Sequence, residues 1–221
     1  MMAALTPSSE DYVKTIWSIS EWNGLEVVPT ELARRMDLSP STVTEAVKKL
    51  ARQGLVDHKR YGPIRLTAKG HHEALRMVRK HRLIETFLYK HLGYSWEALH
   101  DEAEALEHAV SDRFITAIDE LLGRPMRDPH GDPIPREDGS MPEINVYPLT
   151  DVEPGSTVVV SQVDDDNPDV LVYLGDLGVK PGASGTVASQ ATGLGLTNVE
   201  INGREIALPL PVARRVRVTT K

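Results

Sequence analysis

A short acidic segment that contains two histidines, His100–Ser111, carries the residue types best suited to chemistry. Within it Glu104, Glu107 and His108 are spaced i, i+3 and i+4, so on a helix all three side chains project from one face. Two carboxylates and one imidazole are donors for a divalent metal ion, and such a set lacks one or two ligands. The alternative interpretation of the same spacing is an acidic helix face exposed to solvent.

A second pair of possible ligands, His81 and Glu85, is spaced i, i+4 in the preceding helical segment. His81 is in line with an apolar stripe that includes Met77 and Ile84, which favours an ordinary core histidine. The pair becomes a ligand candidate if the two helices pack so that His81 and Glu85 meet His100.

A third polar set belongs to a short helix that we expect after the turn Asp37–Pro40. Ser39 is its predicted N-cap, and Val43, Val47 and Leu50 form its buried stripe. The polar side chains off that stripe are Ser41, Thr42, Thr44, Glu45, Lys48 and Lys49. Small hydroxyls in the first turn and lysines further along suit a helix that lies in the major groove of DNA.

The elements around this helix complete a DNA-binding pattern. Helices are predicted at 11–21 and 30–35, and strands at 55–59 and 64–67 form a hairpin, or wing. The cations of the wing are Lys59, Arg60 and Arg65. A helix, a turn, a second helix and a basic hairpin together indicate a winged helix-turn-helix. The alternative is a small helical domain with a basic face exposed to solvent.

Charge is distributed unevenly along the 221 residues, whose formal net charge is −7. Residues 34–72 hold nine Lys and Arg against three acids, or +6, whereas residues 91–144 hold thirteen acids against four Arg, or −9. One segment therefore suits a polyanion and the other a cation. The chain has no cysteine, which excludes disulfides, thiolate zinc sites and iron–sulfur clusters. No membrane-spanning run or secretory signal is visible, so we expect a cytoplasmic protein.

The sequence pattern predicts an α+β protein with three domains. These are a winged helix-turn-helix domain (1–72), an all-helical dimerisation and metal-binding domain (73–144) and a small SH3-like β-barrel (149–221), with a proline-rich connection at 123–148 that has no regular element. The short β-branched runs of the barrel are 157–160, 185–188, 198–201, 205–208 and 216–219. Asn202-Gly203 between two of them is a type I′ hairpin signal.

Six motifs are the most distinctive features of the chain. They are Ser9-Glu10-Asp11-Tyr12, Leu38-Ser39-Pro40-Ser41-Thr42-Val43, Arg79-Lys80-His81-Arg82-Leu83, His100-Asp101-Glu102-Ala103-Glu104, Glu107-His108-Ala109-Val110-Ser111-Asp112 and Asp128-Pro129-His130-Gly131-Asp132-Pro133-Ile134-Pro135. In these motifs the chain resembles the diphtheria toxin repressor family of metal-dependent regulators, most closely its manganese-responsive branch in the three-domain form. The resemblance is close over about residues 5–140, and the barrel is similar to the family's FeoA-type domain.

The resemblance implies a homodimer, joined through the helices after residue 73, in which each winged helix binds half of a palindromic double-stranded operator. It implies neither a membrane nor an organic small-molecule substrate as partner. It also implies two metal sites per subunit, for Mn²⁺ or alternatively Fe²⁺. The primary site takes Asp11, Glu104, Glu107 and His108, and the ancillary site takes His81, Glu85 and His100, to which the barrel adds Gln162 and Asp165.

Three positions distinguish this chain within the family. Iron-responsive members have Met and Cys where this chain has Asp11 and Glu104, and the replacement of sulfur by oxygen favours Mn²⁺. Lys14 stands where short manganese-responsive members have a further carboxylate.

The sequence therefore predicts a DNA-binding repressor, not an enzyme, that senses Mn²⁺ and controls manganese homeostasis genes. An iron-dependent regulator of the same family is the first alternative. A di-metal hydrolase is the alternative from another class, because carboxylates and imidazoles at helical spacing also build catalytic centres. That alternative leaves the wing and the basic segment unexplained.

Overall fold

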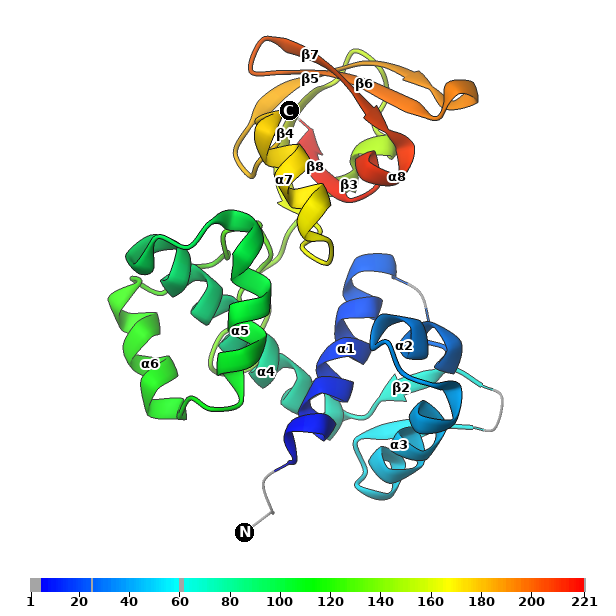
Figure 1. Ribbon diagram of the computed structural model, residues 1–221, viewed down its shortest axis with the longest axis vertical. Helices are drawn as coiled ribbons and strands as arrows, with labels where there is room; N and C mark the ends of the chain where they lie inside the picture. Colours follow the sequence, from blue (N-terminus) through cyan, green and yellow to red (C-terminus); the bar gives the residue numbers. More distant parts are fainter. Residues whose placement is uncertain (1–4, 25, 60–61, 221) are drawn as a thin grey trace. The chain divides into compact units, whose positions relative to one another are not determined.

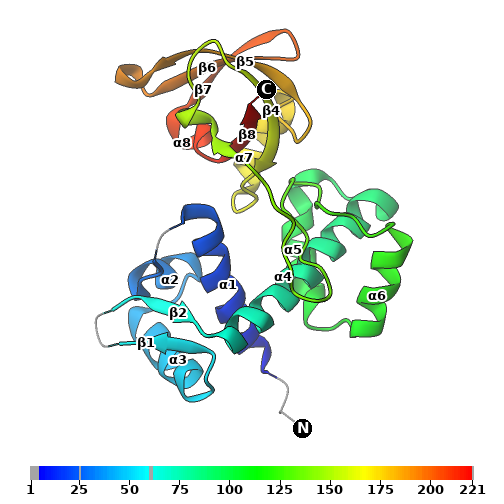
Figure 2. The ribbon, with the colours of Figure 1, turned by 180° about the vertical axis from the view of Figure 1, so that it is seen from behind.

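The computed structural model divides into two compact units. It describes residues 5–24, 26–59 and 62–220. The first unit comprises residues 1–80 and 135–140, and the second comprises residues 81–134 and 141–221. Figures 1 and 2 show the elements of each unit from opposite sides. Within the part of the chain that the structure describes, no helix is long and apolar enough to cross a membrane.

Among its described residues, the first unit contains three helices, a two-stranded hairpin and the beginning of a fourth helix. In chain order these are α1 (Pro7–Asn23), α2 (Pro29–Arg35), α3 (Pro40–Arg52), β1 (Val56–His58), β2 (Ile64–Leu66) and α4 (Ala68–Phe87), which continues into the second unit. The structure starts α1 at Pro7, earlier than the predicted Asp11. The reason is that the Thr6 side chain caps the helix by accepting a hydrogen bond from the Ser9 amide, and proline suits the first helical position.

Helix α3 confirms the helix that the sequence predicts after the turn Asp37–Pro40. The Ser39 side chain accepts a hydrogen bond from the Thr42 amide at 3.1 Å and so caps the helix. Val43, Val47 and Leu50 are buried, which orients the polar face of α3 towards solvent.

The predicted wing is also confirmed, since β1 and β2 pair antiparallel with Val56 opposite Leu66. Val27 forms an isolated bridge with Ile64 and extends this small sheet towards the segment before α2. The tip residue Arg60, one of the predicted DNA contacts, lies outside the described residues.

The second unit opens with helical segments, as predicted for residues 73–122. After α4 these are the π-helical turn η1 (Leu88–Leu92), the 3₁₀ turn η2 (Trp96–Ala98), α5 (Leu99–Glu107) and α6 (Asp112–Leu121). The proline-rich connection then runs without a helix to residue 146, and its regular structure is an isolated bridge between Arg127 and Pro133. The prediction that it contains no regular element is wrong at its end, because Tyr147–Pro148 form strand β3.

The C-terminal part of the second unit is an antiparallel six-stranded sheet in the order β3-β8-β4-β5-β6-β7, which curls as shown in Figure 1. Its other strands are β4 (Thr157–Val163), β5 (Ser184–Ala191), β6 (Leu196–Ile201), β7 (Arg204–Pro209) and β8 (Val216–Thr220). Asn202 and Gly203 both have positive φ, as the predicted type I′ hairpin requires. The helix α7 (Pro168–Asp176), the short helix α8 (Leu210–Ala213) and the 3₁₀ turns η3 (Leu149–Asp151) and η4 (Thr192–Leu194) were not predicted.

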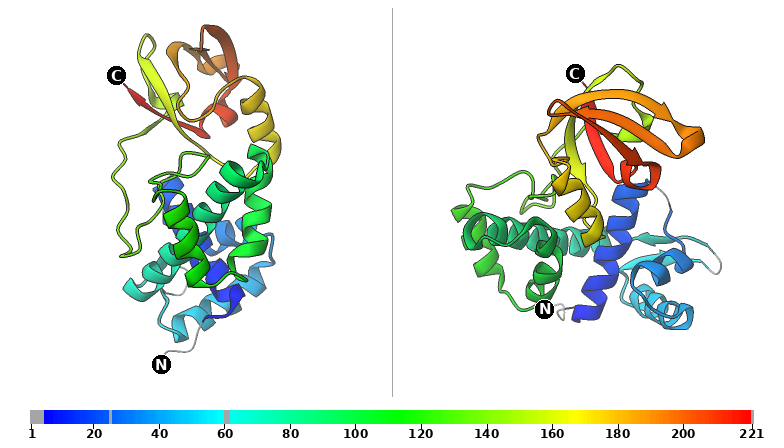
Figure 3. Two further views of the ribbon diagram at one scale, coloured as in Figure 1. Left: turned by 90° about the vertical axis from the view of Figure 1, so that its left-hand side faces the viewer. Right: turned by 45° about the horizontal axis from the view of Figure 1, so that its top comes forward.

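One apolar core runs through the second unit. It includes Leu83 and Ile84 of α4, Trp96 of η2 and, from the barrel, Val160 and Leu171. Helix α7 packs against η2, and Figure 3 shows α7 beside the helical segments of this unit. The shared core therefore holds the segment before α7 close to the acidic and histidine residues of α4 and α5.

Candidate metal centre

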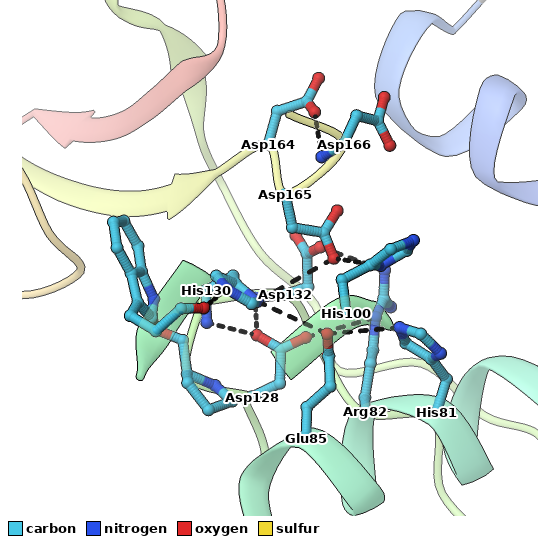
Figure 4. Close-up of polar contacts among 12 residues, drawn as sticks. His81, Arg82, Glu85, His100, Asp128, His130, Asp132, Asp164, Asp165 and Asp166 are labelled. Carbon is cyan, nitrogen blue, oxygen red and sulfur yellow. Dashed lines mark hydrogen bonds and ion pairs between the residues drawn. The ribbon is translucent and has the colours of Figure 1, made fainter. Parts of the chain in front are cut away.

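Four side chains of the second unit converge in a cluster that we call the ancillary cluster: His81, Glu85, His100 and Asp165. One ligand atom from each lies within 4.8 Å of those of the other three (Figure 4). Helix α4 supplies the first two, α5 supplies His100, and the segment between β4 and α7 supplies Asp165. The structure thus brings together four of the five residues that the sequence predicted for the ancillary site.

The contacts within the cluster pair nitrogen with oxygen. His81 Nε2 lies 3.3 Å from Glu85 Oε1, and His100 Nδ1 lies 3.3 Å from Asp165 Oδ2. The His81 and His100 rings meet edge to face, with centroids 4.9 Å apart. The four donors come from three elements of the chain and lie close together, as ligands of a single ion do.

The orientation of His81 is set by Glu107 of α5. His81 Nδ1 lies 2.7 Å from Glu107 Oε2. An ionised carboxylate only accepts, so Nδ1 carries the proton, and Nε2 is the ring nitrogen whose lone pair a cation would take in exchange for a second proton. This is the arrangement in which a histidine ligand donates its second ring nitrogen to a carboxylate.

The fully buried Glu85 carboxylate indicates whether these four residues suit a cation. Among the described residues, neither of its oxygens has a hydrogen-bond partner. A buried carboxylate with unsatisfied oxygens costs free energy unless a positive charge approaches it. The chemistry of the four donors, two imidazoles and two carboxylates, matches a first-row divalent ion.

Mutual attraction keeps these carboxyl groups ionised. Burial alone raises the pKa of Asp165, but the contact and charge of His100 outweigh it and hold that pKa well below its ordinary value. Burial lowers the pKa of His100, yet Asp165 outweighs burial and leaves that pKa above its ordinary value. Burial likewise raises the pKa of Glu85, and attraction to His81 reverses the shift and lowers it. The cluster therefore offers charged oxygen donors at neutral pH.

The predicted primary-site residues of α5 lie next to this cluster. Glu107 is fully buried, and its second oxygen, Oε1, lies 3.6 Å from His108 Nε2. Glu104 Oε1 lies 3.8 Å from His100 Nε2. The two oxygens of Glu107 thus face His81 on one side and His108 on the other, so this carboxylate joins the two sets of predicted ligands. Asp11, the remaining predicted ligand, lies in α1 of the first unit.

Gln162, predicted as an ancillary ligand, is buried in β4 and donates from Nε2 to Asp132 Oδ1 at 2.6 Å. This hydrogen bond ties Gln162 to the loop that contains residues 128–135, and its role as a ligand stays a prediction.

The sequence did not predict that the loop 128–135 and its histidine, His130, would lie beside the ancillary cluster. His130 is fully buried, with Nδ1 3.7 Å from Glu85 Oε1. Asp128 Oδ1 accepts hydrogen bonds from the His130 and Asp132 amides, both at 2.9 Å, and so shapes the loop. The sequence feature that could have indicated this is the segment Asp128–Pro135, in which an aspartate precedes the histidine by two residues and another follows it by two.

Arg82 of α4 anchors the same loop. Its guanidinium donates to the Pro133 carbonyl at 2.7 Å and lies 3.6 Å from Asp128 and 3.4 Å from Asp132. Burial, with repulsion from Asp132 and Glu85, raises the pKa of Asp128 well above its ordinary value despite the guanidinium.

Gly131 allows this loop to approach β4. Its φ is +93°, and a Cβ on it would overlap the Ser161 carbonyl oxygen. We expect Gly131→Ala to lower the free energy of unfolding by about 1–3 kcal/mol more than Gly182→Ala does, because overlap adds to the backbone strain that both changes cause. Gly182 is a matched control, since its φ is +92° and a Cβ on it would meet nothing within 4 Å. Urea unfolding of both variants measures the difference, and equal destabilisation would contradict the close approach.

In the first unit, the predicted DNA contacts form one exposed face of α3. The exposed residues are Ser39, Ser41, Thr42, Thr44, Glu45, Lys48 and Lys49. Two of their charges are already paired, since Lys48 Nζ lies 2.7 Å from Glu45 Oε1. On the wing Lys59 is exposed, whereas Arg65 pairs with Glu26.

A helix-turn-helix unit with a basic wing, followed by a unit that contains a buried histidine–carboxylate cluster, defines a class of protein: DNA-binding regulators that respond to metal ions. The comparisons with known proteins agree with this class. Family profiles match the iron dependent repressor N-terminal DNA binding domain (residues 4–64), the iron dependent repressor metal binding and dimerisation domain (67–136) and the FeoA domain (147–220).

Relatives that match nearly the whole chain identify the family within this class. The iron-dependent repressor IdeR of Mycobacterium tuberculosis is 34% identical over 98% of this chain and 99% of its own length. A solved manganese-dependent transcriptional repressor in complex with manganese is 42% identical, covers 96% of this chain and 100% of its own, and superposes with a TM-score of 0.93. The repressor ScaR with bound Zn²⁺ is 34% identical over 96% of this chain and 99% of its own, with a TM-score of 0.85.

The chain belongs to the diphtheria toxin repressor family of metal-dependent transcriptional repressors, which are DNA-binding proteins. Its α+β fold, with a winged helix-turn-helix, a helical dimerisation domain and a FeoA domain, is confirmed.

Proposed function

We propose that this chain is a Mn²⁺-responsive repressor that controls genes of manganese homeostasis. The observation that carries the proposal is the chemistry of the donors. The chain has no cysteine, and its candidate ligands are carboxylate oxygens and imidazole nitrogens. Carboxylate-rich sites suit Mn²⁺, whereas sulfur ligands select softer ions. The 42% identity to a manganese-dependent repressor supports the same choice.

Two sites would hold the ion. The ancillary site comprises His81, Glu85, His100 and Asp165, whose donor atoms already face one another. The primary site comprises Glu104, Glu107, His108 and Asp11. The support for including Asp11 is the resemblance of its surrounding motif, Ser9–Tyr12, to the family's first helix.

The primary site links the DNA-binding unit to metal concentration, because its ligands come from both units. Without a cation, the carboxylates of Asp11, Glu104 and Glu107 repel one another. A bound divalent cation supplies the positive charge that these carboxylates share. The DNA-competent arrangement then needs a preference of only about 1–3 kcal/mol, as in typical allosteric couplings.

We also propose a homodimer that binds a palindromic operator. Several large apolar side chains of the segment matched by the dimerisation domain are exposed: Leu92, Phe114, Leu121 and Met126. Exposed apolar side chains in one segment are typical of an interface. Two copies of α3 then present hydroxyls and lysines to two half-sites, while the exposed Lys59 of each wing suits contact with phosphate.

An iron-responsive repressor is the second candidate, because curated relatives that cover 98% of this chain include iron-dependent repressors. Fe²⁺ lies only one step above Mn²⁺ in intrinsic affinity. The choice between the ions therefore depends on geometry and ligand number rather than on binding strength.

The test is an anaerobic titration of operator binding. An operator is first selected from random-sequence DNA, and binding is then measured with Mn²⁺, with Fe²⁺ and with a chelator. We expect chelator to abolish specific binding and saturating Mn²⁺ to restore it more fully than saturating Fe²⁺. Fuller restoration by Fe²⁺ would support the iron-responsive candidate, and binding that chelator leaves unchanged would contradict metal dependence altogether.

A further inference from the structure

Glu45 lies at the centre of the exposed face of α3. The buried stripe of this helix is Val43, Val47 and Leu50, and at about 100° per residue Glu45 projects almost opposite to that stripe. Glu45 is also the only acid in the sequence of α3. A carboxylate at this place repels the phosphates of a DNA duplex, so its position points to a role other than backbone contact.

Lys48 keeps the Glu45 carboxylate ionised and orients it. Lys48 Nζ lies 2.7 Å from Glu45 Oε1, and this hydrogen bond, together with the lysine charge, lowers the pKa of Glu45 from its ordinary value. The side chains are 60% and 71% exposed, and exposed pairs of this kind contribute little to stability and separate readily. DNA can therefore draw the lysine to a phosphate while the carboxylate stays directed at the groove.

The hydroxyls of α3 are less available than this carboxylate for contact with bases. Ser39 Oγ lies 2.8 Å from both Ser41 Oγ and Thr42 Oγ1, and it caps the helix by accepting the Thr42 amide. Thr44 Oγ1 donates to the Pro40 carbonyl at 2.8 Å. These hydroxyls are engaged in capping and in backbone contacts, which leaves the carboxylate as the strongest acceptor that the helix presents.

Resting on the proposed operator binding, we propose that Glu45 recognises a cytosine in each half-site by accepting a hydrogen bond from its exocyclic amine in the major groove. An ionised carboxylate only accepts hydrogen bonds. In the major groove cytosine presents an amine donor, whereas guanine presents two acceptors, thymine an acceptor and a methyl group, and adenine an acceptor beside its amine. Cytosine is therefore the base whose edge repels the carboxylate least.

The competing interpretation is that Glu45 only balances the charge of Lys48. The preceding helix, α2, contains a pair of the same kind, since Glu31 Oε1 lies 2.6 Å from Arg34 Nη2 with the same i, i+3 spacing. The base contacts of a helix-turn-helix come from its second helix, which here is α3. The two pairs share their charge chemistry and differ in their helix, so Glu31→Gln is a matched control for Glu45→Gln.

The experiment selects operators from random-sequence DNA with full-length parent, Glu45→Gln and Glu31→Gln proteins, each with the ion, Mn²⁺ or Fe²⁺, that restores binding more fully. We expect the parent and Glu31→Gln to select C·G at one position of each half-site. Glu45→Gln should select A·T there, because glutamine binds adenine through two hydrogen bonds. In fluorescence anisotropy, adenine in place of that cytosine in one half-site should weaken parent binding about 5–150-fold and strengthen Glu45→Gln binding.

Each other outcome overturns a defined part of the proposal. A parent operator without a fixed cytosine in its half-sites would exclude the contact, and this result needs no variant. If Glu45→Gln keeps the parent's base preference and binds all sequences more tightly by a similar factor, Glu45 is only a counter-charge. An equal shift of preference in Glu31→Gln would exclude a direct contact. A parent that binds no specific DNA with either ion would instead contradict the proposed function, and the role of Glu45 with it.

Discussion

Glu107→Gln should remove the metal response of operator binding while the protein stays folded. The side chain keeps its size, and an amide oxygen can still accept the His81 Nδ1 proton, but the negative charge that faces both His81 and His108 is lost. Because this carboxylate touches both sets of proposed ligands, we expect the gain in operator affinity with Mn²⁺, typically about 5–150-fold for such couplings, to fall to about onefold.

Operator binding with and without Mn²⁺, measured by fluorescence anisotropy, checks this prediction. Asp101→Asn is the matched control, since Asp101 is an exposed acid of the same helix α5, and it should retain the full gain. Circular dichroism of both variants shows whether the helices persist. A folded Glu107→Gln protein that keeps the gain of the parent would mean that the metal switch lies elsewhere.

Much of the first unit could be predicted because its signals are local. Ser39 and Pro40 mark a helix start within a few residues of the helix that they start, and Val43, Val47 and Leu50 indicate its buried face by spacing alone. The same logic was available for α7, whose Asn167 side chain accepts a hydrogen bond from the Val170 amide and whose Pro168 occupies the first turn. The sequence pattern did not predict this helix, because it lies between β-branched segments that are typical of strands.

The ancillary cluster could be predicted only in part, because its members are distant in sequence. The i, i+4 spacing links His81 to Glu85, but nothing local shows that Asp165, eighty residues later than Glu85, completes their cluster. His130 was harder still, since its environment is created by packing of the loop 128–135 against β4 and η2. Spacing along one helix finds ligands of that helix, whereas ligands from loops emerge only from tertiary structure.

The double change Asp11→Met, Glu104→Cys should reverse the metal preference. The family resemblance implies that iron-responsive members carry sulfur at these two positions, whereas this chain carries carboxylates. A thioether and a thiol are softer donors, and their introduction removes two negative charges, so the repulsion that Mn²⁺ would relieve is smaller. We expect the variant to bind operator with Fe²⁺ at concentrations where the parent needs Mn²⁺, and the ratio of the two midpoints to shift by at least about tenfold, or about 1.4 kcal/mol.

Anaerobic titrations of operator binding with each ion measure that ratio. Asp101→Cys is the control for a thiol on α5 outside the proposed site, and it should leave the parent's preference for Mn²⁺ in place. A shift in the control as large as in the double variant would mean that any exposed thiol recruits Fe²⁺. An unchanged ratio in the double variant would locate selectivity outside Asp11 and Glu104. Selectivity would then have to arise from the geometry and the number of the ligands rather than from the identity of these two donors.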